Sequence, residues 1–314
     1  MDLTEWLLDA DPAIRWQVLL DLHDDVDGAA AERRRVATEG WGARLLALQG
    51  DDGYWSGEEY GEDGDRRSTI WSLQSLRRLG VDPEASVVRS AIARVRDSVV
   101  WRHHGALPFF DGEVEECVNG GVLALASYFG VLGTGSDRIV GRLLDQQLPD
   151  GGWNCEPREE SERSSFDSTV CVLEGLLAYE RAVGDDASNG DVSTVAAARR
   201  RGEEYLLERN LFRRRTTGEL VLPRYANFAF PSYWFYDVLR ALDHFRDAGA
   251  APDARIAPAI DLLLEQRADD GRWAAGRPWH GEVYFALDAA EGEPSRWNTL
   301  RALRVLRWVD ASAA

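Results

Sequence analysis

The sequence predicts an all-α protein that folds as one domain over residues 1–314, a single (α/α)6 toroid of helical hairpins. Three observations predict this fold. A short motif of the form Q-x-x-D-G-x-W occurs three times, a leucine-rich helical pattern occurs six times, and no segment shows the alternating hydrophobicity of a half-buried strand. No linker divides the chain.

The QxxDGxW motif covers three stretches of the chain: 49–55, 147–153 and 267–273. The third copy has arginine in place of the glutamine, with Gln266 one position early. The Asp-Gly pair predicts a turn that ends an outer helix, because glycine adopts the left-handed conformation without strain. We therefore expect the motif tryptophans to pack near outer-helix ends: Trp55, Trp153 and Trp273.

Six inner helices are predicted from pairs of leucines that recur every 50 to 66 residues. The first leucines of these pairs are Leu19, Leu73, Leu123, Leu173, Leu239 and Leu300. The stretches around them are apolar on nearly every side, as expected for helices packed between two neighbouring layers.

Outer helices are predicted where apolar residues recur at three- and four-residue spacing. They cover 30–48, 84–99, 137–148, 194–208 and 254–267, and a short helix at 3–9 completes the outer layer. We expect eleven or twelve main helices and no β-sheet beyond a short hairpin. The stretch 184–193 is rich in Asp, Ser and Gly and predicts a surface loop.

Composition narrows the class of protein. The net charge is −18 and every basic side chain except histidine is arginine, so the chain repels phosphate backbones and nucleic acid is not an expected partner. No run of about eighteen apolar residues is present, which argues against a transmembrane segment. The acidic N-terminus lacks the features of a signal peptide, and the three cysteines fit reduced thiols. We therefore expect a cytoplasmic protein.

The motif repeat resembles that of squalene–hopene cyclases, and the ring of hairpins resembles the β subunit of protein prenyltransferases. The chain as a whole is similar to short, one-barrel squalene cyclase-like bacterial proteins within this terpenoid cyclase and prenyltransferase superfamily. Full squalene cyclases have two such barrels, whereas this chain has room for one. The resemblance implies that the motif residues tie outer helices together. It also implies a cavity at the N-terminal ends of the inner helices.

Asp167 is the sharpest catalytic candidate. Class II terpene cyclases protonate an alkene with the middle aspartate of D-x-D-D-T at the start of an inner helix, and the matching stretch here reads Ser165-Phe166-Asp167-Ser168-Thr169. The middle aspartate and the threonine match, while serines replace the other two acids. We expect Ser165 or Ser168 to hydrogen-bond Asp167. The alternative is that Asp167 only caps its helix.

Other site residues are expected just before the inner helices. Aromatic faces would stabilise a cation, arginines would hold a diphosphate head as bidentate donors, and glutamates would remove the final proton. The aromatic candidates are Trp71, Phe166, Trp234, Tyr236 and Trp297. The arginines are Arg67, Arg163 and Arg296, and the glutamates are Glu113, Glu115 and Glu116.

These residues favour an isoprenoid-handling enzyme, most concretely a small class II-like terpene cyclase or isomerase that acts on a hydrophobic isoprenoid. Two alternatives stay open: a non-catalytic toroid that binds a lipid or a protein, and a carbohydrate-active α/α barrel. A dry, aromatic cavity would favour the isoprenoid-handling enzyme. An open, polar cavity would favour the carbohydrate-active barrel, and a ring filled with side chains would favour the non-catalytic toroid. The oligomeric state is left open.

No cofactor and no metal are expected. Glu115-Glu116-Cys117 resembles the acid-x-Cys pair that holds zinc in protein prenyltransferases, and His280 would be its third ligand. This zinc site is kept as an alternative. Cys155 is interpreted as a buried small thiol.

Overall fold

The computed structural model describes residues 2–61, 64–102, 105–184 and 190–313 of the chain. This part is mostly helical, as predicted, and holds thirteen α-helices. The inner ones are α2 (Pro12–His23), α5 (Thr69–Leu79), α7 (Glu116–Tyr128), α9 (Phe166–Val183), α11 (Val238–Ala248) and α13 (Arg296–Ala313). The outer ones are α1 (Leu3–Leu8), α3 (Val26–Arg35), α4 (Gly40–Leu46), α6 (Ser86–Ser98), α8 (Thr134–Asp145), α10 (Gly190–Leu207) and α12 (Ala257–Glu265).

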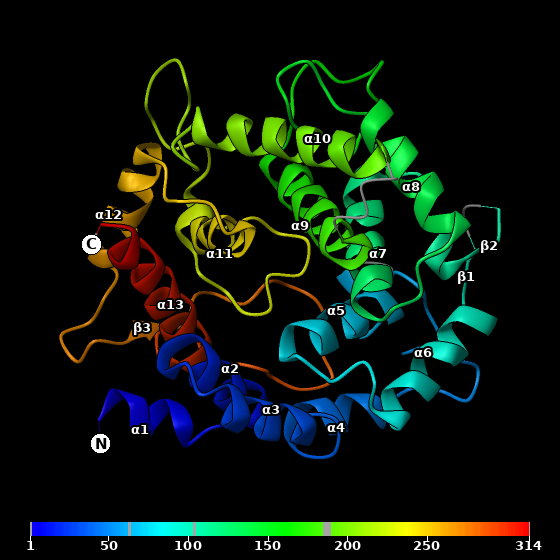
Figure 1. Ribbon diagram of the computed structural model, residues 1–314, viewed down its shortest axis with the longest axis horizontal. Helices are drawn as coiled ribbons and strands as arrows, with labels where there is room; N and C mark the ends of the chain where they lie inside the picture. The colour runs from blue at the N-terminus through cyan, green and yellow to red at the C-terminus, as the bar shows by residue number, and fades with distance from the viewer. Residues whose placement is uncertain (1, 62–63, 103–104, 185–189, 314) are drawn as a thin grey trace.

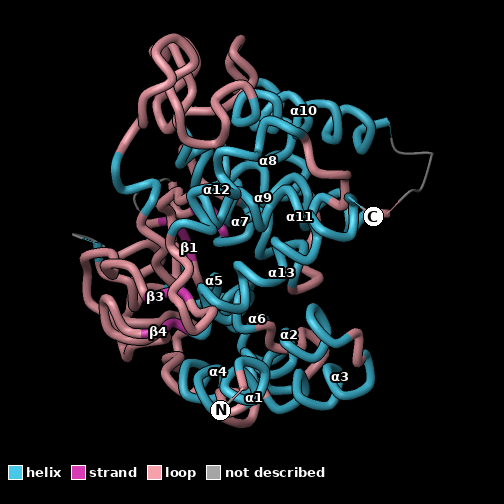
Figure 2. Tube along the Cα trace, turned by 90° about the vertical axis from the view of Figure 1, so that its left-hand side faces the viewer, coloured by secondary structure: helices cyan, strands magenta, loops and turns pink. Residues whose placement is uncertain are grey.

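The inner helices form a ring inside the outer ones. Figure 1 shows α4, α6, α8, α10 and α12 around the rim and the inner helices within it. Inner helices that follow one another along the chain touch, and the last, α13, packs on the first, α2, which closes the ring. Buried apolar side chains of the inner and outer helices belong to one core cluster, so the core runs through both layers. Long loops gather on one side of the ring (Figure 2).

The three motif tryptophans have the same environment in each repeat. Their indole Nε1 groups donate to the carbonyls of Leu45, Leu143 and Leu263, ten positions earlier, at 2.7 to 2.8 Å. Their backbone amides donate to the hydroxyls of Thr69, Thr169 and Thr299 in the first turn of the next inner helix, at 3.1 to 3.2 Å. The predicted packing of Trp55, Trp153 and Trp273 near outer-helix ends is confirmed, and all three are buried.

The motif glutamines connect neighbouring outer helices. The side-chain amide of Gln49 donates to the carbonyls of Gly53 and Ala91, and Gln147 bonds Gly151 and Ala198 in the same way. The motif glycines have φ between 82° and 99°, which confirms the predicted left-handed turns.

Three local predictions were wrong. The outer helix expected at 30–48 is two helices, because Asp11 accepts a hydrogen bond from the amide of Trp41 and thereby starts α4 anew at Gly40, which has a φ of +61°. This break raises the number of helices to thirteen. The segment expected as a helix at 254–267 opens with a 3-10 turn, Ala254–Ile256, before α12.

Two small antiparallel sheets occur where at most one hairpin was expected. The hairpin joins β1 (Val100–Trp101) and β2 (Leu107–Pro108). The second sheet pairs β3 (Trp273–Ala274) with β4 (Pro294–Ser295), because the third motif lies beside the segment that leads into α13. Of the surface loop predicted at 184–193, residues 185–189 lie outside the described part, and α10 begins at Gly190.

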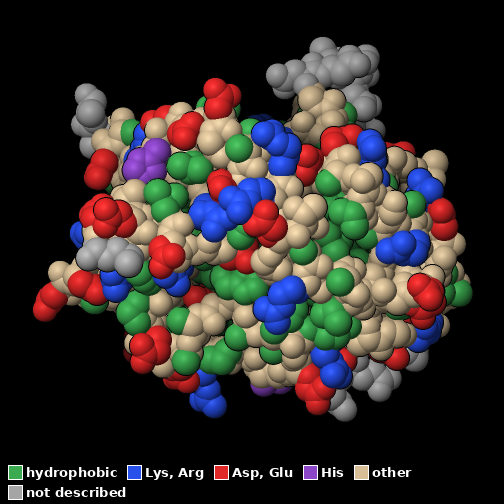
Figure 3. All heavy atoms as spheres, turned by 90° about the horizontal axis from the view of Figure 1, so that it is seen from below, with side chains coloured by type: hydrophobic (Ala, Val, Ile, Leu, Met, Phe, Trp, Pro, Cys, Tyr) green, Lys and Arg blue, Asp and Glu red, His purple; other side chains and the backbone are tan. Residues whose placement is uncertain are grey.

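The surface has mixed character. Acidic, arginine and apolar side chains are interspersed on the face shown in Figure 3. None of the helices in the described ranges is both long enough and apolar enough to cross a membrane.

Candidate active site at the start of helix α9

Asp167 lies in the first turn of α9 and is 3% exposed. Its helix is capped by Ser165, whose hydroxyl accepts from the amide of Ser168 at 3.4 Å. The alternative that Asp167 caps α9 is therefore wrong. The predicted partners of its carboxylate are also corrected, because Ser165 serves as the cap and Ser168 pairs with the Cys155 thiol at 3.1 Å.

The carboxylate of Asp167 is held by a segment far along the chain. Arg224, in the 3-10 turn Pro223–Ala226, donates Nη1 to Oδ1 at 2.9 Å and Nη2 to Oδ2 at 2.6 Å. The amide of Tyr236 donates to Oδ1 at 2.7 Å, and the Tyr225 hydroxyl lies 3.5 Å from Oδ2. Burial acts to lower the pKa of Arg224, but the hydrogen bonds and the charge of Asp167 outweigh it and raise that pKa.

Four aromatic rings surround this ion pair. Phe166 contacts Tyr205, Tyr225 and Tyr236 with ring centroids 5.2 to 5.5 Å apart. Tyr225 and Tyr236 contact one another at 4.8 Å. Burial raises the pKa of all three tyrosines, so their hydroxyls stay protonated and the wall carries no charge of its own.

A groove of about 370 Å³ lies beside Asp167. Phe166, Tyr205 and Tyr225 line its apolar side. Its polar side carries five arginines: Arg163, Arg209, Arg213, Arg214 and Arg215. Three predicted residues, Arg163, Phe166 and Asp167, therefore share one groove. Its basic side can hold an anion by charge-assisted hydrogen bonds.

A second group of aromatic side chains continues from Asp167 toward α5. The guanidinium of Arg224 lies over Phe235 and Trp279, at 5.6 and 6.0 Å from the ring centroids, and these two rings stack at 4.0 Å. The guanidinium of Arg66 lies over Phe235, Trp71 and Tyr233 at 5.1 to 5.5 Å.

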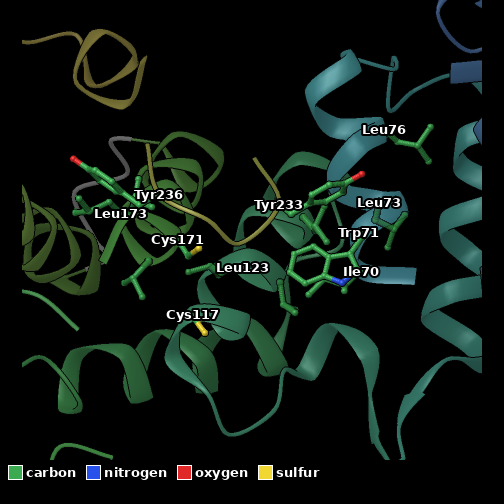
Figure 4. Packing of buried hydrophobic residues seen from close by; sticks show 14 of the residues in the cluster. Ile70, Trp71, Leu73, Leu76, Cys117, Leu123, Cys171, Leu173, Tyr233 and Tyr236 are labelled. Atoms are coloured by element: carbon green, nitrogen blue, oxygen red, sulfur yellow. The ribbon is translucent and has the colours of Figure 1, made fainter. Parts of the chain in front are cut away.

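Trp71 and Trp234 belong to this group. Trp71 is buried and meets Tyr233 edge-on at 5.8 Å, as Figure 4 shows. Trp234 is half-buried and contacts Phe235 at 5.5 Å. Two predicted aromatics thus adjoin the ring system around Asp167 through Phe235 and Tyr233.

The three predicted glutamates have different surroundings. Glu113 accepts hydrogen bonds from the amides of Val114 and Glu115 in its own loop. Glu116 is buried, its pKa is raised by burial, and it pairs with Arg142 of α8 at 2.8 Å. Glu115 is exposed and is linked through two thiols to Ser168, next to Asp167.

Those thiols are Cys117 and Cys155, whose sulfur atoms are 3.1 Å apart. The hydrogen bond between them raises the pKa of Cys117, with burial adding to the rise, and lowers the pKa of Cys155. With Glu115 they form a group whose ligand atoms lie within 4.8 Å of one another, a donor set that zinc accepts. Among the described residues, Cys155 and not His280 is the third member of this group, which corrects the expected ligand set.

Three predicted residues lie elsewhere. Arg67 pairs with Asp65 and Glu282 at the surface, at 2.9 and 2.7 Å. Arg296 donates to the carbonyl of Trp6 at 3.0 Å and lies over its ring, on the outer side of the ring of helices. Among the described residues, neither arginine pairs with Asp167 or Arg224 or lies over the rings around them. Trp297 is buried and stacks on Phe230 at 4.0 Å.

Trp297 lines a cavity of about 360 Å³ in the centre of the ring. Residues of all six inner helices line it, mostly from their middle and C-terminal turns. The expected cavity was aromatic and lay at the N-terminal ends, whereas this one is largely charged. At the N-terminal end of α5, the long loop before α11 instead places Tyr233 against Trp71, and Phe235 beside Arg66.

Sequence reasoning missed Arg224, Tyr205 and Tyr225. Arg224 and Tyr225 lie in the irregular stretch between α10 and α11, where no periodicity marks a position. Tyr205 lies in the last turn of an outer helix, and nothing local indicates that it turns toward α9.

No protein-family model and no curated protein matches the chain. Solved structures of the type II terpene cyclase MstE from Scytonema are similar to it. The apo enzyme is 18% identical, with a TM-score of 0.41 and coverage of 96% of this chain and 87% of that one. A variant of that enzyme in complex with geranylgeranyl dihydroxybenzoate, its substrate, is 18% identical with a TM-score of 0.40 and the same coverage.

Proposed function

We propose that the chain is an isoprenoid-handling enzyme, a class II-like terpene cyclase or isomerase built on a single (α/α)6 toroid, with its reacting site around Asp167. One observation carries the proposal. The guanidinium of Arg224 contacts Asp167 and lies over the rings of Tyr225, Phe235 and Trp279 at 5.0 to 6.0 Å. This position holds a planar, delocalised cation beside aromatic faces, and such faces also stabilise a tertiary carbocation.

The neighbouring groove supports a substrate with an anionic head and an apolar body. Its arginines would bind a diphosphate or carboxylate by paired hydrogen bonds, while Phe166 and the tyrosines would contact the isoprenoid chain. The arrangement would fix the substrate by its head and leave its double bonds against the aromatic rings.

In the proposed reaction Asp167 gives its proton to one carbon of a double bond. The new C–H bond uses the π electrons, and a carbocation forms on the other carbon, against the aromatic faces. A base then removes a proton from a neighbouring carbon and restores a double bond. Glu115 is the predicted glutamate best placed for this step, because it reaches Ser168 through the two thiols.

Asp167 cannot give a proton while it is paired with Arg224. We infer that the anionic head of the substrate draws Arg224 away, since its side chain is 31% exposed and can turn toward the groove. Once it is free of its counter-charge, Asp167 can take up from water the proton that it then gives to the double bond. Substrate binding would thereby make the acid available.

A second function is favoured by the same ion pair. If Arg224 stays on Asp167, the group has no proton to give and the chain would bind an isoprenoid without converting it. The two functions differ in one measurable respect, the appearance of product.

The test is incubation with farnesyl diphosphate, geranylgeranyl diphosphate and geranylgeranyl dihydroxybenzoate, followed by mass spectrometry of the extracted organic products. Quenching of tryptophan fluorescence reports binding separately. We expect a cyclised or isomerised product from the wild type and loss of at least about a hundredfold in rate for Asp167→Asn, the scale of general acid catalysis.

Asp261→Asn is the matched control, because Asp261 is exposed on α12, and it should keep the full rate. Binding without product in the wild type would select the non-catalytic function. Full activity of Asp167→Asn would remove Asp167 from the mechanism.

A further inference from the structure

The central cavity holds a second group of charged residues that the proposed reaction does not use. Seven arginines line it: Arg77, Arg78, Arg181, Arg240, Arg246, Arg301 and Arg304. Four carboxylates line it as well: Asp21, Glu174, Asp243 and Asp247. The wall therefore carries excess positive charge inside a chain whose net charge is −18.

The acids in the wall are shared among several arginines. Glu174 lies 2.7 Å from Arg240, 3.3 Å from Arg78 and 3.8 Å from Arg77. The single negative charge of Glu174 can balance only one of these three positive charges. Asp243 is shared in the same way by Arg301 and Arg304, at 2.8 and 2.7 Å.

Arg301 has unused hydrogen-bond donors. It is 4% exposed, and only its Nε is bonded, to Asp243 at 2.8 Å. Its Nη1 and Nη2 groups have no hydrogen-bond partner among the described residues, and a carboxylate oxygen of Asp237 lies 3.8 Å from Nη2. Buried donors are almost always paired in folded proteins, so these two point to an acceptor that a ligand supplies.

Arg78 shows the same shortage of partners. Within the described part of the chain its Nε has no hydrogen-bond partner, and Nη2 reaches Glu174 only at 3.3 to 3.4 Å. Burial lowers the pKa of Arg78 to about 10, against the effect of Glu174 and together with the charges of Arg240, Arg77 and Arg301. A bound anion would relieve this repulsion.

Apolar side chains line the cavity as well. They are Trp16, Leu20, Leu177, Phe230 and Trp297, and Phe230 stacks on Trp297 at 4.0 Å. A bare inorganic ion would leave these surfaces against water. A ligand with an apolar ring or chain would cover them.

We propose that the central cavity binds a small organic anion, with a carboxylate or phosphate held by Arg301 and Arg78 and an apolar body against Phe230 and Trp297. Planar guanidinium groups match both oxyanions, which are the two sources of the same chemistry. The site is separate from the groove beside Asp167, and its existence does not depend on the proposed reaction.

The test uses benzoate, phenyl phosphate and inorganic phosphate as probes, with isothermal titration calorimetry at constant ionic strength. Benzoate or phenyl phosphate should bind one to one, and the stronger of the two identifies the oxyanion. Inorganic phosphate should bind at least about tenfold more weakly, since it has no apolar body. Equal affinity for all three probes, or no binding of any, overturns the proposal.

Arg301→Met should weaken the better probe at least about tenfold, the scale of a lost charged hydrogen bond. Arg89→Met, at an exposed position on α6 outside both sites, is the matched control and should leave the affinity unchanged. Loss of affinity in Arg213→Met but not in Arg301→Met would place the ligand in the groove beside Asp167 and overturn the proposal. If Arg301→Met does not fold, a crystal of the wild type with phenyl phosphate decides: density beside Arg301 supports the site, and its absence there rejects it.

Discussion

Arg224 and Asp167 are joined by two parallel hydrogen bonds, Nη1 to Oδ1 at 2.9 Å and Nη2 to Oδ2 at 2.6 Å. The pair connects the irregular segment before α11 to the first turn of α9. It fixes the aspartate beside the rings of Tyr225 and Tyr236. In the proposed function, this ion pair must open before Asp167 can act as an acid.

Thr169 matches the threonine of the D-x-D-D-T pattern, yet its hydroxyl has a structural role, because it accepts a hydrogen bond from the backbone amide of Trp153 at 3.1 Å. Thr169→Val should lower the free energy of unfolding by about 1–3 kcal/mol, because it leaves a buried backbone N–H without an acceptor. Urea denaturation monitored by circular dichroism measures this loss.

The repeat supplies internal comparisons for that prediction. Thr69→Val and Thr299→Val should destabilise the protein by similar amounts. Each of these threonines accepts a hydrogen bond from the backbone amide of the motif tryptophan in its own repeat. Thr38→Val, at an exposed position, should cost less than about 0.5 kcal/mol. A loss at Thr169 far above that at the other two motif threonines would contradict a purely structural role.

Asp288 should make stability depend on pH. Its burial raises its pKa to about 6, against the hydroxyl of Ser295, which donates to its carboxylate at 2.7 to 2.8 Å. A raised pKa means that the folded state binds the proton more tightly, so this contribution is full below the unfolded pKa, near 4, and is lost as pH rises through about 6. We expect the loss to be about 1–2 kcal/mol, less than the full shift implies, because the side chain is partly exposed.

Thermal or urea denaturation between about pH 4 and about pH 7.5 tests this sign. Asp288→Asn should flatten the dependence of the free energy of unfolding on pH in this range. Relative to the wild type, the variant should gain stability as the pH rises. Asp261→Asn should leave the profile unchanged. A difference between Asp288→Asn and the wild type that is the same at every pH would show that Asp288 does not titrate in this window.

Purified protein to which no metal has been added should contain well under one zinc per chain. The two sulfurs, 3.1 Å apart, are closer than the roughly 3.8 Å between two thiolates on tetrahedral zinc with Zn–S bonds of about 2.3 Å. The hydrogen bond to Cys155 and burial also raise the pKa of Cys117, so a proton competes with the metal. Elemental analysis by mass spectrometry measures the content.

Cysteine variants would expose an error in that prediction. Zinc at one per chain that disappears in Cys117→Ser and Cys155→Ser, but remains in Cys171→Ser, would establish a site with Glu115. Loss in His280→Gln instead would restore the ligand set expected from sequence.

The helical layers and the motif packing could be predicted from sequence because their signals are local and repeated. The leucine spacing indicates α5, α7, α9, α11 and α13 at nearly regular intervals. The Asp-Gly-x-Trp stretch contains both the turn and the tryptophan, whose indole Nε1 donates to the carbonyl of Leu143 in the second copy. Each copy supports the interpretation of the others.

The partners of Asp167 could not be predicted, because they depend on a loop that folds across the ring. Nothing in Pro223-Arg224-Tyr225 shows that this turn meets α9, 57 residues earlier. The central cavity did leave a signal. Glu174, Arg240 and Arg301 each follow the first leucine of a pair, so a charged residue occupies the same position in three of the inner helices.

A double-mutant cycle measures the coupling free energy between Asp167 and Arg224. Asp167→Asn and Arg224→Gln should each lower the free energy of unfolding by about 2 kcal/mol, because each leaves a charged partner without its counter-ion. The coupling energy should be about 1.5–3 kcal/mol, below the 3–5 kcal/mol for breaking a fully buried pair, since the Arg224 side chain is 31% exposed. The exposed pair Arg89 and Glu84 is the control and should couple by less than about 0.5 kcal/mol. A ligand that draws Arg224 away must supply at least this coupling energy. If the cycle returns more than about 4 kcal/mol, the ion pair would survive substrate binding, and the non-catalytic binding function would be the correct one.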